Sequence, residues 1–155
     1  MKFSTREDIE APIEFVFDQV SDFAALERSA LRRGAEVQRI DDKPQNGVGM
    51  MWDTAFEVRG KRREMRLELT EYDPPSGMCF IATSPSLHCD LVLDLVALSR
   101  GRTRMSIEME LKAQNLSARL LVQSLKLARS SMFKRYEMRA ASYARDLEDK
   151  YSRRA

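Results

Sequence analysis

Few side chains in this sequence have the types and the spacing of a catalytic centre. His88 is the only histidine, so a nucleophilic site of the Ser/His/Asp or Cys/His kind would have to use it. The alternation of residues 87–95 places His88 with Asp90 and Asp94 on a polar face. We therefore expect a histidine at the surface or at the edge of a turn.

The two cysteines, Cys79 and Cys89, are not part of a CxxC pair, and with one histidine they make a poor zinc ligand set. We predict no metal site. Both lie five positions from Ser84, so a symmetric hairpin would place them opposite each other on one face. Two reduced, packed thiols are expected, and a redox pair is the alternative. Gly47-Val48-Gly49 lacks the third glycine and the lysine of phosphate-binding loops, so no cofactor is expected.

Polar residues that the strand alternation places on the apolar face of the sheet are more informative about a possible site. They are Thr5, Glu7, Thr54, Arg63, Glu71 and Thr103. A carboxylate deep in an apolar cavity could act as a general acid or base, and Glu7 is the one weak catalytic candidate. The alternative is that Glu7 pairs with a basic side chain or reaches water. Arg135 and Arg139, on the last helix, could meet a ligand carboxylate or phosphate, or form surface ion pairs.

Length and composition are those of a globular chain. The 155 residues are 43% hydrophobic and 32% charged, and we expect one domain over 1–155. The first residues show no apolar segment typical of a secretory signal. Together with the two cysteines, this pattern predicts a protein of the reducing cytoplasm.

Charge is unevenly distributed along the chain. Residues 1–116 carry 16 basic and 20 acidic side chains, whereas residues 117–155 carry 10 basic and 4 acidic ones. A basic C-terminal segment suits a solvated helix face, an anionic partner or a membrane surface. The segment lacks the dense basic patch and the interleaved exposed aromatic residues of nucleic-acid-binding modules, so no nucleic acid is expected.

The residue pattern predicts an α+β fold. Residues 2–10 alternate as a strand, Pro12 can begin a short helix, and Ser21 or Asp22 can cap a second one that Gly34 ends. Six more strands follow between residues 35 and 112, with a tight turn at Asn46-Gly47. One face of this sheet is apolar and the other polar, which predicts an antiparallel sheet covered on one side.

A long helix is expected over roughly 116–150, capped by Asn115 or Ser117. Its main apolar stripe is continuous from Leu121 to Leu147. A second apolar ridge lies on a different side of the helix from the main stripe, at Leu116, Leu120, Leu127 and Met138. We expect the two short helices to cover this ridge; the alternatives are a partner subunit or a membrane.

The opening segment resembles the signature of the SRPBCC, or START-like, superfamily, which includes polyketide cyclases and lipid-transfer domains. The residues that carry the resemblance are Ile9, Ala11, Pro12, Glu14, Val16, Phe17, Val20 and Asp22. The turn at Gly47 and Gly49, the Pro74-Pro75 turn and the terminal helix also fall where that superfamily has them. The resemblance implies a helix-grip fold. In this fold a bent seven-stranded antiparallel sheet wraps around a long C-terminal helix and leaves an apolar cavity between the two.

The resemblance predicts that the protein binds, and could transport, a hydrophobic small molecule such as a lipid, an isoprenoid or a polyketide-like compound. The expected cavity-lining residues are Trp52, Thr54, Phe56, Met65, Leu67, Leu69, Leu91, Leu93, Met105, Ile107, Leu125, Met132 and Tyr136. One alternative is a cyclase or dehydratase acting on a bound polyketide-like substrate. Another is an interaction module whose basic C-terminal helix makes transient contact with a membrane or a protein. Either a monomer or a homodimer fits the sequence.

Overall fold

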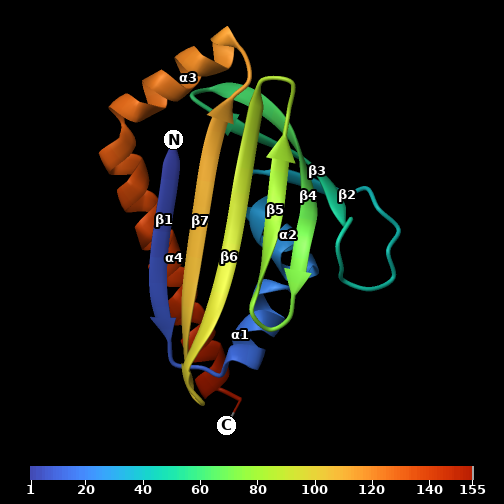
Figure 1. Cartoon of the computed structure of the whole chain (residues 1–155), viewed down its shortest axis with the longest axis vertical. Coiled ribbons are helices and arrows are strands. Elements are labelled where there is room, and N and C mark those ends of the chain that lie inside the picture. The colour runs from blue at the N-terminus through green and yellow to red at the C-terminus, as the bar shows by residue number, and fades with distance from the viewer. Residues whose placement is uncertain (155) are drawn as a thin grey trace.

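The computed structural model describes residues 1–154 and contains one antiparallel sheet with the strand order β1-β7-β6-β5-β4-β3-β2 (Figure 1). Within that part of the chain the sheet has seven strands and is accompanied by four helices. The strands are β1 (Lys2–Ile9), β2 (Glu36–Arg39), β3 (Met51–Val58), β4 (Lys61–Asp73), β5 (Gly77–Thr83), β6 (Leu87–Ser99) and β7 (Arg102–Ala113). The α+β helix-grip fold expected from the sequence is confirmed.

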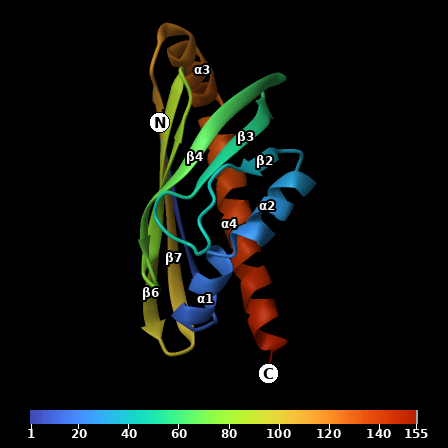
Figure 2. The ribbon, with the colours of Figure 1, turned by 90° about the vertical axis from the view of Figure 1, so that its right-hand side faces the viewer.

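Two short helices follow β1, as predicted. Helix α1 (Ile13–Val20) begins after Pro12, and the hydroxyl of Thr103 donates to the Ala11 carbonyl at 2.8 Å to fix this turn against β7. Helix α2 (Phe23–Arg32) is capped by the Asp22 carboxylate, which accepts from the Ala25 backbone N–H. Both helices lie on the concave side of the sheet, where α1 contacts β6 and β7 (Figure 2).

A β-bulge reverses the facing of residues in the second half of β4. Leu69 pairs with Phe80, but Glu71 pairs with Cys79, so Thr70 is the extra residue. Beyond a bulge the two-residue alternation shifts by one position. Glu71, expected on the apolar face, is therefore exposed on the outer face, and Tyr72 turns inward to contact Phe17.

The connection between β2 and β3 is a long loop, and the predicted tight turn at Asn46-Gly47 is wrong. The first ladder pair next to the loop joins Arg39 to Trp52. The Asp41 carboxylate organises the loop by accepting from the guanidinium of Arg39 and from the backbone N–H groups of Lys43 and Met51. A shielded carboxylate with three donors thus overrides the local hairpin preference of the Asn-Gly pair.

The long terminal helix is broken in two at Ala128, which the sequence pattern did not predict. Helix α3 (Leu116–Leu127) is capped by Asn115, and helix α4 (Arg129–Ser152) runs along the sheet against β1. At the break, the hydroxyls of Ser124 and Ser131 donate to the backbone carbonyls three residues earlier. Such bonds compete with the helix ladder and favour a bend, which turns α3 over the strand ends (Figure 1).

The second apolar ridge is not covered by the two short helices, so that expectation is wrong. Its four side chains remain solvent-exposed, with exposed fractions of 71% for Leu116, 60% for Leu120, 91% for Leu127 and 64% for Met138. Helices α1 and α2 pack instead against the sheet and the C-terminal half of α4.

Gly34 provides a test of the boundary between α2 and β2. Its φ is +90°, and a Cβ there would meet nothing within 4 Å, so only backbone strain opposes a side chain. We expect Gly34→Ala to lower the free energy of unfolding by about 1–2 kcal/mol, measured by urea denaturation. Gly101 has equal space without the positive φ, so Gly101→Ala should cost less than about 0.5 kcal/mol. Equal losses would contradict the boundary.

Asp41 provides a pH test of the loop. The hydrogen bond from Arg39, followed by those from the Met51 and Lys43 backbone, holds the pKa of Asp41 well below its usual range. A lowered folded-state pKa stabilises the fold above the unfolded-state pKa, and this contribution is lost as the pH falls through the folded-state value. The parent should therefore exceed Asp41→Asn in stability at neutral pH, and the difference should shrink below about pH 4. Asp42→Asn, which removes the same charge from the exposed neighbour and leaves the Asp41 hydrogen bonds in place, is the matched control.

Candidate ligand-binding site

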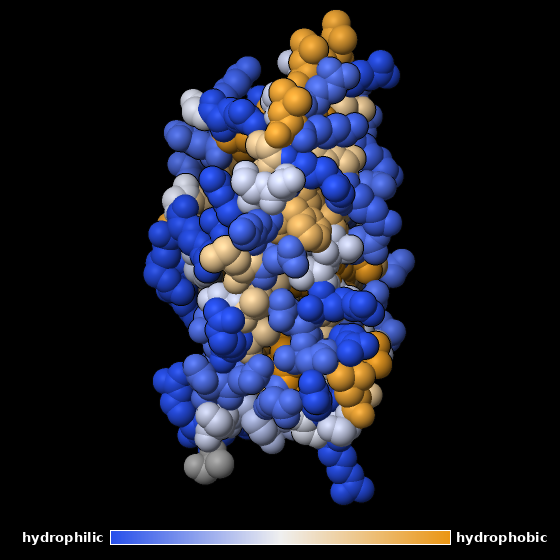
Figure 3. Space-filling model, turned by 90° about the vertical axis from the view of Figure 1, so that its left-hand side faces the viewer, coloured by the Kyte–Doolittle hydropathy of each residue, from blue (hydrophilic) through white to orange (hydrophobic). Residues whose placement is uncertain are grey.

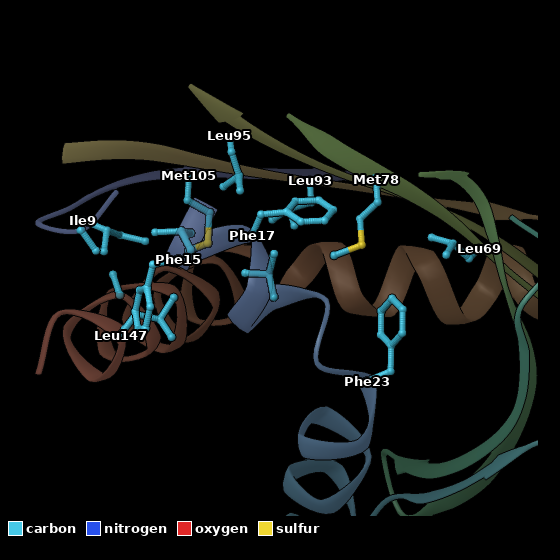
Figure 4. Close-up of a cluster of buried hydrophobic side chains, with 14 of the residues drawn as sticks. Ile9, Phe15, Phe17, Phe23, Leu69, Met78, Leu93, Leu95, Met105 and Leu147 are labelled. Carbon is cyan, nitrogen blue, oxygen red and sulfur yellow. The ribbon is translucent and has the colours of Figure 1, made fainter. Parts of the chain in front are cut away.

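The inner, concave face of the sheet is packed at its two ends by two separate hydrophobic clusters. The α1 cluster joins α1 and the end of α4 to the sheet, and Figure 4 shows Phe17 and Leu147 reaching toward Leu93, Leu95 and Met105. The α3 cluster lies at the other end of the strands and is formed by Met65, Leu87, Cys89, Ala118 and Val122. Both clusters exclude water, since their core residues are at most 9% exposed.

Between the two clusters, a band of inward-facing side chains is only half-buried. This middle band consists of Thr5, Thr54, Leu67, Phe80, Leu91 and Ile107. Each lies two positions along its strand from a buried residue of the same face. On β6, for example, Cys89 and Leu93 are buried while Leu91 between them is partly accessible. The middle band is thus less tightly covered than the clusters on either side, although Leu67, Phe80 and Ile107 still pack against the edge of the α1 cluster.

Helix α4 lies beside the middle band, along β1. Met132, Phe133 and Tyr136 are half-buried on the side of α4 that faces β1 and β7. The Tyr136 hydroxyl donates to the Ile107 carbonyl at 2.9 Å. Burial raises the pKa of Tyr136 to about 12, so the phenol stays protonated at neutral pH. It can orient a ligand through its hydroxyl oxygen but is a poor base.

Arg63 is the one polar group of the inner face whose hydrogen-bonding capacity is clearly unmet among the described residues. It lies directly opposite Phe56 in the β3–β4 ladder and therefore on the same, inner face. Its Nε is shielded from solvent and has no hydrogen-bond partner. No carboxylate forms an ion pair with Arg63 in residues 1–154. A buried donor without an acceptor costs about 1–3 kcal/mol, which a bound anion could offset.

A surface hollow of about 700 Å³ lies beside Phe56, between the end of α2, strand β3 and helix α4. Arg33 from the end of α2 and Arg139 from α4 both line it, together with Glu57 and the ion-paired Arg62 and Glu36. Arg139 is one of the two arginines expected from the sequence to meet a ligand anion, and the structure brings it to this hollow. Arg135, its companion in that expectation, is exposed on α4 and does not line the hollow.

The structure distributes the thirteen predicted cavity residues over all three regions. Thr54, Leu67, Leu91 and Ile107 lie in the half-buried middle band, and Met132 and Tyr136 are half-buried on α4. Phe56 and Met65 belong to the α3 cluster, and Leu125 is buried on α3. The remaining four, Trp52, Leu69, Leu93 and Met105, are buried within the α1 cluster, so they act as core rather than as an accessible wall.

Residues 1–148 match the family described as "Polyketide cyclase / dehydrase and lipid transport". The chain belongs to this family. The match spans almost the whole sequence, and it agrees with the resemblance seen in the opening segment. Among curated proteins, none matches the chain significantly in sequence.

Solved structures with the same fold are distant in sequence from this family member. The Zhui aromatase/cyclase from Streptomyces sp. R1128 has a TM-score of 0.65 at 13% identity, with 99% of this chain and 94% of that chain covered. The protein TTHA0849 from Thermus thermophilus has a TM-score of 0.68 at 16% identity, with coverages of 96% and 95%. Norcoclaurine synthase from Thalictrum flavum has a TM-score of 0.62 at 15% identity, with coverages of 81% and 82%. These similarities show the fold.

The carboxylate candidate expected from the sequence, Glu7, does not lie among the apolar residues of the middle band. Glu7, near the end of β1, lines an open hollow of about 580 Å³ together with Thr5, Ile107 and Glu137. Most of the rest of that wall is formed by polar residues of the outer face, which keeps it wet. Thr103, also expected at the cavity, is fully buried and serves the turn before α1.

The surroundings of His88 and of the two cysteines are those of structural rather than catalytic residues. The His88 ring lies 3.0 Å from the Asp90 carboxylate on the outer face, as its strand parity predicted. Cys79 and Cys89 do not lie opposite each other as they would in a symmetric hairpin, because the register pairs Cys79 with Val92 and Cys89 with Ala82. Both thiols are free, and burial raises the pKa of each to about 11, which disfavours the reactive thiolate. Within residues 1–154, no three side chains of the metal-ligating types come together.

Two contributors to the site were missed in the sequence. Phe80 is one, because residues 78–83 are apolar on both faces and their alternation gives no orientation. Arg33 is the other, because a basic residue at a helix end has no periodic signal that links it to a distant helix such as α4.

The partial burial of the middle band leads to a prediction about the free energy of unfolding that does not depend on any ligand. Leu91 and Leu93 face the same way on β6, but only Leu93 is buried in a cluster. We expect Leu93→Ala to lower the free energy of unfolding by about 3 kcal/mol, and Leu91→Ala by roughly half as much. Urea denaturation of both variants tests this. Equal losses would mean that the middle band is as dry as the clusters and that there is no cleft.

Proposed function

We propose that this protein binds a hydrophobic small molecule in the cleft between the inner face of the sheet and α4. The observation that carries the proposal is the half-buried middle band, whose apolar members Leu67, Phe80, Leu91 and Ile107 face inward. Desolvating an apolar ligand against such a surface is favourable by about 25 cal/mol for each Å² removed from water. Clefts with apolar walls and few polar groups are typical binding sites for small molecules.

The polar groups at the cleft favour a ligand with an anionic end. Arg63 carries this inference, because its Nε is a buried, unmet donor. The nearby hollow beside Phe56 adds Arg33 and Arg139, although Glu36 and Glu57 line it as well. A guanidinium binds carboxylate or phosphate through paired hydrogen bonds. The ligand class that fits both features is an amphipathic anion, such as a fatty acid or another lipid or polyketide-like acid.

The family supports this class of ligand. Its description joins polyketide cyclase and dehydrase activities with lipid transport, and the Zhui protein is described as an aromatase/cyclase. We favour binding over catalysis for this chain, because cyclase chemistry needs a convergent acid–base pair. Here Tyr136 is held protonated by burial, and Glu7 faces a wet hollow.

Fluorescence titration with cis-parinaric acid and with its methyl ester tests the proposal. The parent should bind the acid more tightly than the ester. Arg63→Met should weaken binding of the acid by about tenfold or more and leave the ester nearly unchanged. Arg66→Met, on the outer face of the same strand, is the matched control and should change neither affinity.

A second variant tests the location of the ligand. Leu91→Trp places a larger side chain in the middle band and should reduce binding of both the acid and the ester. Circular dichroism of the variant verifies that the fold is kept. If the parent binds neither probe, or if Leu91→Trp binds both as tightly as the parent, the cleft is not the binding site. Native mass spectrometry of protein purified from cells would then identify any ligand that it carries.

A further inference from the structure

Three exposed leucines form a straight ridge on α3, at Leu116, Leu120 and Leu127. At 100° per residue their side chains lie within about 40° of one another around the helix. Their exposed fractions of 71%, 60% and 91% place this leucine ridge among the most exposed apolar residues of the described chain. Figure 3 shows apolar side chains projecting at the end of the molecule where α3 lies.

The opposite side of α3 is held firmly against the protein. Ala118, Val122 and Leu125 are buried there, about 180° from the ridge. The guanidinium of Arg59, at the tip of the β3–β4 hairpin, donates to the Ser124 carbonyl at 3.1 Å. That of Arg129, just past the break, donates to the Lys2 carbonyl at 3.2 Å. The helix is therefore already folded and packed, and its ridge points outward without rearrangement.

The charged side chains of the segment that carries the ridge have one sign. Residues 111–136 contain six basic side chains and no acidic one: Lys112, Arg119, Lys126, Arg129, Lys134 and Arg135. Arg119 and Lys126 lie about 80–100° round the helix from the ridge, at its flank. Among the described residues, neither they nor Arg129 form an ion pair with a carboxylate. A ridge of leucines flanked by unneutralised cations is the pattern of a helix that lies in a membrane interface.

We propose that α3 docks the protein onto an anionic lipid bilayer. The leucine ridge enters the boundary between headgroups and acyl chains, and Arg119 and Lys126 contact the anionic headgroups. No helix of the described chain is long and apolar enough to span a bilayer, so the contact is peripheral. The proposal concerns a surface outside the cleft and stands whether or not the cleft binds a ligand.

A second copy of the chain fits this surface less well. In a two-fold dimer built on the ridge, the same patch would come from both subunits. The cations beside one ridge would then face the identical cations of the other, with no acidic residue in the segment to neutralise them. Like charges brought together in an interface are unfavourable, whereas an anionic membrane neutralises them.

Sedimentation with lipid vesicles tests the docking surface. The parent should sediment with vesicles of phosphatidylglycerol and remain in solution with vesicles of phosphatidylcholine, and added salt should weaken binding. Leu120→Ser with Leu127→Ser should lower the apparent affinity by about tenfold or more. The matched control is Val96→Ser with Leu98→Ser, which removes two exposed apolar side chains from β6 and should bind as the parent does.

Two double variants that each remove two positive charges complete the test. Arg119→Gln with Lys126→Gln should weaken binding to phosphatidylglycerol, whereas Arg28→Gln with Arg32→Gln, which removes the same charge from exposed positions of α2, should have a much smaller effect. Because the altered side chains are exposed, circular dichroism should show an unchanged fold. The proposal is overturned if the parent does not bind, if the ridge variant binds as the parent does, or if light scattering shows a dimer that the ridge variant separates.

Discussion

The structure depends on a mismatch of widths between a sheet and a helix. Seven strands spaced about 4.8 Å apart present an inner face about 29 Å wide, whereas one α-helix covers about 10 Å. Helix α4 packs along β1, so it cannot bury the inner surface of β4, β5 and β6. The remaining apolar surface must be covered by other elements or stay accessible. Helix α1 covers one end of it and α3 the other, and the middle band is what these short helices leave.

The polar groups of that middle region show which side of the cleft lacks a partner. The hydroxyls of Thr54 and Tyr136 donate to backbone carbonyls, at 2.8 and 2.9 Å. Their hydrogen bonds are thus satisfied within the protein, as buried polar groups require. Arg63 is different, because its shielded Nε has no acceptor. This asymmetry is the basis for the ligand orientation that we propose, with the anionic end near β3 and β4 and the apolar part toward Leu91 and Ile107.

The sequence predicted what depends on local periodicity and missed what depends on distant contacts. The two-residue alternation correctly placed the inner faces of β1, β6 and β7, and the caps at Asp22 and Asn115 and the turn at Gly34 were found from residue type. The errors at Glu71, at the two cysteines and at the loop after β2 come from a bulge, a hairpin register and a side chain that bonds ten residues away. The break at Ala128 was missed because the apolar stripe runs through it without interruption, so periodicity alone predicts one continuous helix; the Ser124 and Ser131 hydroxyls bond to the backbone there.

Helix α3 joins the two surfaces of this molecule for which we propose a role. Ala118 and Val122, on its inner side, belong to the cluster that closes one end of the cleft. Its outer side carries the leucine ridge. The proposed lipid-contacting surface and the proposed ligand site therefore lie on opposite sides of one twelve-residue helix. The side chains of the two sides point in opposite directions, and no ridge leucine belongs to either cluster. Docking and ligand binding can therefore be altered independently by substitution, although a single packed helix supports both.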